Sequence, residues 1–184
     1  VVALMWVPGR FVRVAGTVRT LCQAAAARLS GPGIAPPVVV TGPDCRCIAT
    51  DQWTEAGVTE ATVLIGPAAR NTAPASLAAA LWLEARDADA LMLVAPSDHV
   101  IPDGDAFRAA VSAAIPAAQD GQLVTFGITP TRAETGYGYL ELEAGNTANI
   151  HEPQKLSRFV EKPDALRAEE MIKAGHFLWN AGIF

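Results

Sequence analysis

Short apolar runs alternate with helical patterns through the first two thirds of the chain. Apolar runs without polar alternation are typical of strands buried on both faces of a parallel sheet. The runs span 1–6, 37–41, 61–65, 91–96 and 123–128. Helical spacing marks the segments 17–29, 44–56, 75–85 and 103–114. This βαβ rhythm predicts an α/β fold: Rossmann-like, three-layer α/β/α, with a mainly parallel sheet and helices on both faces.

Capping and breaking residues set the expected helix boundaries. Asp44 is expected to cap the second helix, and Gly57 follows its end. Asn71 or Thr72 is expected to cap the third helix, which then packs tightly on the sheet because it is almost wholly alanine and leucine. Pro116 is expected to bend or end the fourth helix, because proline removes a backbone hydrogen bond.

The rhythm changes after residue 128. Residues 135–143 alternate like an edge strand, and 145–154 are polar without pattern, which indicates a loop. A strand at 157–160 then leads to a helix that Asp164 caps and that ends at Gly175.

Length and composition favour one globular domain. The chain has 184 residues, of which 51% are hydrophobic. The net charge is −5 without a basic run, so the electrostatic footprint of a nucleic-acid partner is missing, while a small anionic ligand stays compatible. The opening apolar stretch is too short for a membrane span and lacks the charged start of a signal peptide, so no membrane partner is expected.

The cysteines indicate a reducing setting. Cys22, Cys45 and Cys47 are too few for a secreted disulfide framework, and a cytoplasmic protein is the simpler interpretation. Cys45 and Cys47 lack nearby residues to complete a zinc site, so we expect them to be structural or incidental.

Candidate chemistry begins at Asp98, directly after the run at 91–96. In open α/β sheets, ligands bind outside the carboxyl ends of the strands, and a carboxylate there commonly holds a hard cation such as magnesium. The competing interpretation is that Ser97 or Asp98 closes a turn. Arg70, at the start of a helix, is suited to an anion or a nucleobase, although an ordinary surface arginine fits its spacing equally well.

Three further candidates lie in the second half of the chain. Gly136 and Gly138 flank Tyr137, and glycines allow a backbone to approach a ligand such as a sugar ring, although a plain bulge is the commoner cause of strand glycines. Lys162 follows the strand at 157–160, much as Asp98 follows its own strand. Asn180 is polar in apolar company and needs a hydrogen-bonding partner in the protein or a ligand.

Five ordered motifs resemble one family, the mannose-1-phosphate guanylyltransferases among the sugar nucleotidylyltransferases. The resemblance covers nearly the whole chain, and the ordered set is far more specific than any single motif. The motifs are RNTAP at 70–74, PSDHVI at 96–101, ETGYGY at 134–139, FVEKP at 159–163 and WNAGIF at 179–184.

The resemblance implies an activity and a role for each candidate. GTP and mannose 1-phosphate would be the substrates, GDP-mannose and pyrophosphate the products, and Mg²⁺ the cofactor. It leaves a homodimer open. Asp98 would hold the metal and act in catalysis with Lys162, which would bind the sugar phosphate. The remaining residues would bind guanosine (Arg70, Asn71, Thr72) or the sugar (Tyr137, Gly138, Glu161, Asn180).

The sequence departs from the family pattern near its start. The family has a glycine-rich loop, G-G-x-G-T-R-L-x-P, then a proline-lysine pair; here residues 5–11 stand in their place, with Gly9 at the lysine position. The sequence also reaches Phe184 without the later aspartate of the metal site, so the domain is expected to be incomplete. Three readings follow: an active enzyme whose loop is absent from this sequence, a non-catalytic sugar-nucleotide-binding homologue or regulatory subunit, and a nucleotidylyltransferase for another hexose 1-phosphate.

Overall fold

The computed structural model describes all residues except 7–12, 14–17, 32, 67–71 and 147–151. The chain divides into two compact units, Val1–Gly104 and Asp105–Phe184, and each is described by itself. The expectation of one nucleotidylyltransferase domain over 1–184 stays a prediction.

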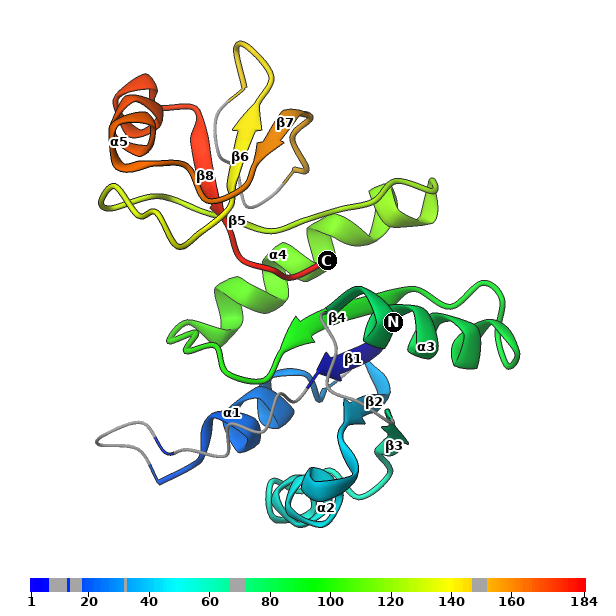
Figure 1. The fold of residues 1–184 in the computed structure, drawn as a ribbon. Coiled ribbons are helices and arrows are strands. Elements are labelled where there is room, and N and C mark those ends of the chain that lie inside the picture. Colours follow the sequence, from blue (N-terminus) through cyan, green and yellow to red (C-terminus); the bar gives the residue numbers. More distant parts are fainter. Residues whose placement is uncertain (7–12, 14–17, 32, 67–71, 147–151) are drawn as a thin grey trace. The chain divides into compact units, whose positions relative to one another are not determined.

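A four-stranded parallel sheet forms the centre of the first unit (Figure 1). Its strand order is β3-β2-β1-β4, and every neighbouring pair is parallel. The strands are β1 (Val2–Trp6), β2 (Ala35–Thr41), β3 (Thr62–Ile65) and β4 (Met92–Pro96). The parallel sheet with its helices confirms the predicted fold class.

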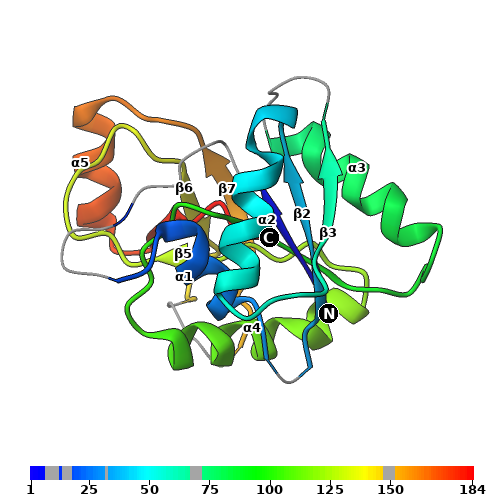
Figure 2. The same cartoon turned by 90° about the horizontal axis from the view of Figure 1, so that it is seen from below.

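Helices cover both faces of this sheet, as Figure 2 shows for α2 and α3. The helices are α1 (Leu21–Arg28), α2 (Arg46–Glu55) and α3 (Thr72–Glu84). Leu4, Val38 and Val94 point to the face under α3, where they pack with Ala75 and Ala79. Because side chains alternate along a strand, Ala3, Met5 and Val39 point to the opposite face.

The first two helices begin later than their patterns predicted. α1 starts at Leu21, where Thr20 accepts a hydrogen bond from the Gln23 backbone and Gln23 returns one in a capping box. The expected cap Asp44 is wrong: it lies inside a 3₁₀ turn, η1 (Pro43–Cys45), and Cys45 precedes α2 without a side-chain cap. Proline at the first position of that turn favours the separate short helix.

The expectation that α3 packs tightly on the sheet is only half right. Ala75, Ala79 and Leu83 are buried at helical spacing, but Leu77 and Leu81 are 60% and 57% exposed. A helix that is apolar all round hides which face is buried, because its sequence carries no amphipathic signal.

The second unit contains an antiparallel sheet of order β5-β8-β6-β7. Its strands are β5 (Gly127–Ile128), β6 (Tyr139–Leu142), β7 (Leu156–Val160) and β8 (Phe177–Asn180). β6 lies between β8 and β7, so the edge position predicted for 135–143 is wrong. β8 was not predicted from the sequence.

The predicted parallel strand at 123–128 is also wrong. Only Gly127 and Ile128 form a strand, and they pair with β8 in antiparallel orientation. Leu123 is 97% exposed, so the apolar run is not buried as a unit.

Two helices complete this part of the chain. α4 (Gly104–Gln119) continues through Pro116, contrary to the expected bend or end; the surrounding alanines favour helix strongly enough to tolerate the one lost backbone bond. α5 (Ala165–Ala174) is capped by Asp164 and ends at Gly175 in the left-handed conformation, as predicted. Its Ala168 and Met171 pack against one face of the antiparallel sheet.

Candidate functional site

In the first unit, Asp98 lies just past the carboxyl end of β4. Pro96 ends the strand, Ser97 is fully buried, and Asp98 lies half-buried in the turn that follows. Asp98 therefore lies in a turn at the carboxyl end of a parallel strand, and its role as a cation ligand stays a prediction. The Ser97 Oγ atom has no hydrogen-bond partner among the described residues.

A pocket of about 430 Å³ adjoins this turn. Burial lowers the pKa of the His99 imidazole; the Asp98 carboxylate opposes that shift and the Arg28 guanidinium adds to it. His99 is therefore predominantly neutral at pH 7, with a ring nitrogen that can accept a hydrogen bond. The pocket is lined by the segment that leads into α1, by α1 itself and by the segment after Asp98, namely Val18–Leu21, Ala24, Arg28 and 99–101.

The predicted nucleoside residues are placed only in part. Thr72 is the first residue of α3, half-buried, and its carbonyl accepts a hydrogen bond from the Ser76 hydroxyl at 3.0 Å. Arg70 and Asn71 lie outside the described residues. Their predicted contacts with guanosine stay predictions.

Asp98 fits a magnesium site as one ligand of a shared set. In the described part of the chain, no three His, Cys, Asp or Glu side chains are grouped closely enough to hold a metal ion by themselves. Magnesium in phosphate-transfer sites is typically bound by one or two carboxylates together with substrate phosphates and water. A single half-buried carboxylate at a strand end matches that donor set. Cys45 and Cys47 are free thiols.

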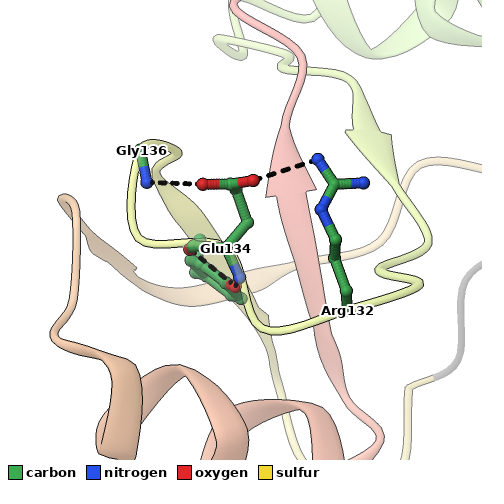
Figure 3. A network of polar contacts seen from close by, with 4 residues as sticks. Arg132, Glu134 and Gly136 are labelled. Carbon is green, nitrogen blue, oxygen red and sulfur yellow. Dashed lines mark hydrogen bonds and ion pairs between the residues drawn. The ribbon is translucent and has the colours of Figure 1, made fainter.

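In the second unit, Glu134 organises the loop that leads into β6 (Figure 3). One carboxylate oxygen accepts a hydrogen bond from the Gly136 backbone at 3.1 Å, and the other meets the Arg132 guanidinium at 3.0 Å. These two donors hold the pKa of Glu134 below its usual value. The Tyr139 hydroxyl accepts a hydrogen bond from the Glu134 N–H at 3.0 Å and donates one to the Glu134 carbonyl at 2.9 Å. These two hydrogen bonds connect the start of the loop to β6.

Aromatic contacts attach this loop to β8. The Tyr137 ring meets Trp179 edge-on, with ring centroids 5.3 Å apart, and the Arg132 guanidinium lies 5.5 Å from the centre of the same ring. Tyr137 is 44% exposed, while Trp179 is buried. The contact with the buried Trp179 therefore holds the partly exposed Tyr137 ring in place.

Three predicted sugar residues from separate motifs meet at Gly138. The Asn180 N–H donates to the Gly138 carbonyl at 2.8 Å. A methyl group on Gly138 would lie 3.1 Å from the Glu161 carboxylate and 2.4 Å from the Phe159 ring. Gly138 precedes β6 rather than interrupting it, so the close approach of the end of β7, and not a strand bulge, requires a glycine here.

Lys162 has an unusual backbone. It is the only described non-glycine residue with positive φ, at 42°, although it precedes Pro163. Proline disfavours helical geometry in the preceding residue, and strained backbone of this kind gathers at functional sites. Its Nζ lies 3.3 Å from a Glu161 carboxylate oxygen, and both side chains are more than half exposed. A cation and an acceptor are thus presented together.

Sequence reasoning missed the residues that hold these groups. Glu134 and Arg132 stand beside the glycine-tyrosine motif, and the short spacing of Glu134 from Gly136 was the available signal. Thr125 bonds to Asn180 across 55 positions of the chain, so no local pattern could reveal it.

The candidates divide between the two units. Thr72 and Asp98 belong to the first, and Tyr137, Gly138, Glu161, Lys162 and Asn180 belong to the second. None of the helices in the described part of the chain is long and apolar enough to cross a membrane.

Curated relatives match the chain along most of its length. XanB, a xanthan biosynthesis protein of Xanthomonas campestris pv. campestris (strain B100), is 43% identical over 177 residues, which are 96% of this chain and 37% of XanB. A mannose-1-phosphate guanylyltransferase of Escherichia coli K12 is 40% identical over 182 residues, 96% of this chain and 37% of the relative. The chain thus spans well under half the length of these relatives.

Solved structures share the fold. A Helicobacter pylori protein described as a mannose-6-phosphate isomerase superposes with a TM-score of 0.85 at 27% identity, covering 100% of this chain and 69% of that one. A Thermus thermophilus protein described as a mannose-1-phosphate geranyltransferase gives 0.78 at 31% identity, covering 98% and 55%. The family model for nucleotidyl transferases matches residues 7–184. The chain belongs to the nucleotidyl transferase family.

Proposed function

We propose that this protein transfers a guanylyl group from GTP to mannose 1-phosphate, giving GDP-mannose and pyrophosphate. The observation that carries the proposal is the convergence at Gly138, whose carbonyl accepts the Asn180 backbone N–H and whose Cα lies against the Phe159 ring and the Glu161 carboxylate. Three motifs that are far apart in the sequence thereby bring a glycine, an asparagine and a glutamate together. These are the groups that recognise a sugar ring. The choice of mannose as the sugar and guanine as the base is supported by the names of the relatives.

The side chains suit the two ends of a sugar phosphate. The Glu161 carboxylate accepts hydrogen bonds from sugar hydroxyls, and Lys162 beside it offers a positive charge to the phosphate. Tyr137 gives an apolar surface on which a ring can lie. The sugar phosphate oxygen then attacks the α-phosphorus of GTP, and pyrophosphate leaves.

Charge neutralisation is the main task in such a reaction, because phosphoryl chemistry needs little covalent help from the protein. Lys162 neutralises the sugar phosphate, which otherwise repels the triphosphate. Asp98 would hold magnesium, and the ion would supply positive charge to phosphate oxygens. Arg70, Asn71 and Thr72 are proposed to bind the guanosine. A cytoplasmic location and a homodimer also stay proposals.

Turnover in the Asp98→Ala variant tests this assignment. The account predicts folded protein, by unchanged circular dichroism, and a loss of GDP-mannose formation of at least about a hundredfold, since metal charge stabilisation is worth several kcal/mol. A Leu123→Ala variant is the matched control, because Leu123 is fully solvent-exposed. An Asp98→Ala rate equal to that of the parent would remove Asp98 from the mechanism.

One observation favours a second candidate, a homologue that binds the sugar nucleotide without turnover. No glycine-rich loop stands between Trp6 and Pro8, and backbone N–H groups of such loops bind phosphates in many nucleotide enzymes. Calorimetric binding of GDP-mannose, combined with no product from GTP and mannose 1-phosphate, would support this function. Product formation by the intact protein would exclude it.

The sugar and the base are tested by a substrate panel. Sites that hydrogen-bond a hydroxyl reject analogues that leave their polar groups unpaired. We expect mannose 1-phosphate and GTP to have the highest kcat/KM among hexose 1-phosphates and nucleoside triphosphates. A higher value for glucose 1-phosphate would change the sugar while leaving the reaction class intact.

A further inference from the structure

The Asn180 side chain is held by two partners in its own unit. Asn180 is the last residue of β8, and its Oδ1 atom lies 3.1 Å from the Thr125 hydroxyl and 3.1 Å from the Gly182 backbone nitrogen. Gly182 has a φ of 66°, a left-handed conformation that glycine adopts readily. The Thr125 hydroxyl and the Gly182 backbone N–H therefore both hold the side-chain amide of Asn180.

These contacts decide which end of the amide faces outward. A backbone N–H can only donate, so the atom that it meets must be the amide oxygen and not the amide nitrogen. The Thr125 proton is shared between that oxygen and the Ile183 carbonyl, which lies 3.2 Å away. An amide oxygen has two lone pairs, and both have donors here. Asn180 is left with only its NH₂ group to offer a ligand.

We propose that Thr125 is a positioning residue for the sugar site, which together with the Gly182 amide makes Asn180 a pure hydrogen-bond donor. This inference rests on the proposed function, in which Asn180 contacts the sugar. The ligand atom that Asn180 recognises is then an acceptor oxygen. The Asn180 NH₂ group donates a hydrogen bond to the oxygen of a sugar hydroxyl. Without the Thr125 hydroxyl, the amide loses one of its two anchors, and part of the binding free energy goes into ordering it.

Two substitutions separate positioning from packing. Thr125→Val removes the hydroxyl at nearly constant shape, and Thr125→Ser keeps it while removing a methyl group. We expect Thr125→Val to raise the KM for mannose 1-phosphate by about three- to tenfold, the usual worth of one hydrogen bond, with the KM for GTP unchanged. Thr125→Ser should restore the parent KM. Equal effects of both variants, or an equal rise in the KM for GTP, would overturn the proposal.

A double-mutant cycle shows whether Thr125 acts through Asn180. In an Asn180→Ala background, Thr125→Val should have no further effect on the KM for mannose 1-phosphate, because the group that it orients is gone. Additive effects would contradict the proposal. If the parent protein shows no turnover, the proposed catalysis fails, and calorimetric affinity for GDP-mannose replaces KM in the same cycle. Absence of both turnover and GDP-mannose binding overturns both proposals.

The unaltered protein provides an independent measurement that does not depend on variants folding. Mannose 1-phosphates that carry hydrogen or fluorine in place of one hydroxyl at C2, C3 or C4 differ in acceptor strength, and neither form can donate at that position. A donor-only Asn180 predicts that, at one position, the fluoro compound binds more tightly than the deoxy compound. Equal weakening by both compounds at every position would contradict it.

Discussion

Replacing Gly138 by alanine would add a methyl group where three segments of the second unit meet. The added carbon would lie 2.4 Å from the Phe159 ring and 3.1 Å from the Glu161 carboxylate. Non-bonded carbons prefer a separation of about 3.5–4.0 Å, so the ring must retreat by roughly 1 Å. Phe159 is half-exposed and has room to turn, so we expect a cost near the lower end of the roughly 1–3 kcal/mol that overpacking brings.

The function should suffer more than the fold. A cost of that size lowers Tm by only about 2–4 °C per kcal/mol in a chain of this length. The same methyl group crowds the Glu161 carboxylate, which is proposed to bind the sugar hydroxyls, and so displaces it. We therefore expect Gly138→Ala to stay folded and to raise the KM for mannose 1-phosphate at least about tenfold, because a displaced carboxylate loses a charge-assisted hydrogen bond.

Gly136→Ala is the matched control for this prediction. Its methyl group would meet only the flexible Glu134 carboxylate, at 3.4 Å, an ordinary contact distance. Neither glycine has positive φ, so alanine is conformationally allowed at both positions. Thermal unfolding and initial rates on both variants provide the comparison. A Gly138→Ala enzyme with the parent KM for mannose 1-phosphate would refute the reasoning that places the sugar beside this residue.

Two further predictions concern titrating groups. Burial raises the pKa of the Cys22 thiol to about 11, so at pH 8 only about one molecule in a thousand carries its thiolate. Iodoacetamide should therefore modify the exposed Cys47 far sooner than Cys22. Mass spectrometry that finds Cys22 modified first would contradict its burial. The Gly136 amide and Arg132 lower the pKa of Glu134 below its ordinary 4.5, so its contribution to stability is complete above that pH and is lost as the pH falls through the lowered pKa. The Tm difference between the parent and Glu134→Gln should therefore shrink below pH 4.5, and a difference independent of pH would argue against the network.

The parallel half of the fold is largely readable from the sequence. Strands β1, β2 and β4 follow apolar runs that a buried parallel sheet requires, and β3 follows such a run although it lies at the edge and is only partly buried. Asp98 was predicted at the carboxyl end of β4 for the same reason, since it directly follows the run. Local pattern and tertiary environment agree there.

In the antiparallel half, local sequence patterns did not predict how the strands pair. The run at 123–128 has the composition of a buried strand, yet only two of its residues pair, because their partners lie in β8, more than fifty positions later. β8 itself has four residues, too few for a reliable periodicity. An edge and an internal strand differ by what pairs beside them, so the internal position of β6 was not readable from its alternation.

The candidate site follows the same division. Gly138, Glu161 and Asn180 were found because each stands in a distinctive motif, and the structure brings them together. Thr125 is an ordinary threonine in an apolar run, and its role depends entirely on a contact across the sheet. Residues that act through other residues carry no signature of their own.

Pyrophosphate release by the intact protein tests the central claim most directly. We expect release from GTP only when mannose 1-phosphate and a divalent cation are both present, with one GDP-mannose formed for each pyrophosphate. The same assay should report neither product when the sugar phosphate is omitted. Folded protein that binds GDP-mannose but releases no pyrophosphate from the complete mixture would contradict the account, and would identify the chain as a sugar-nucleotide-binding member of its family.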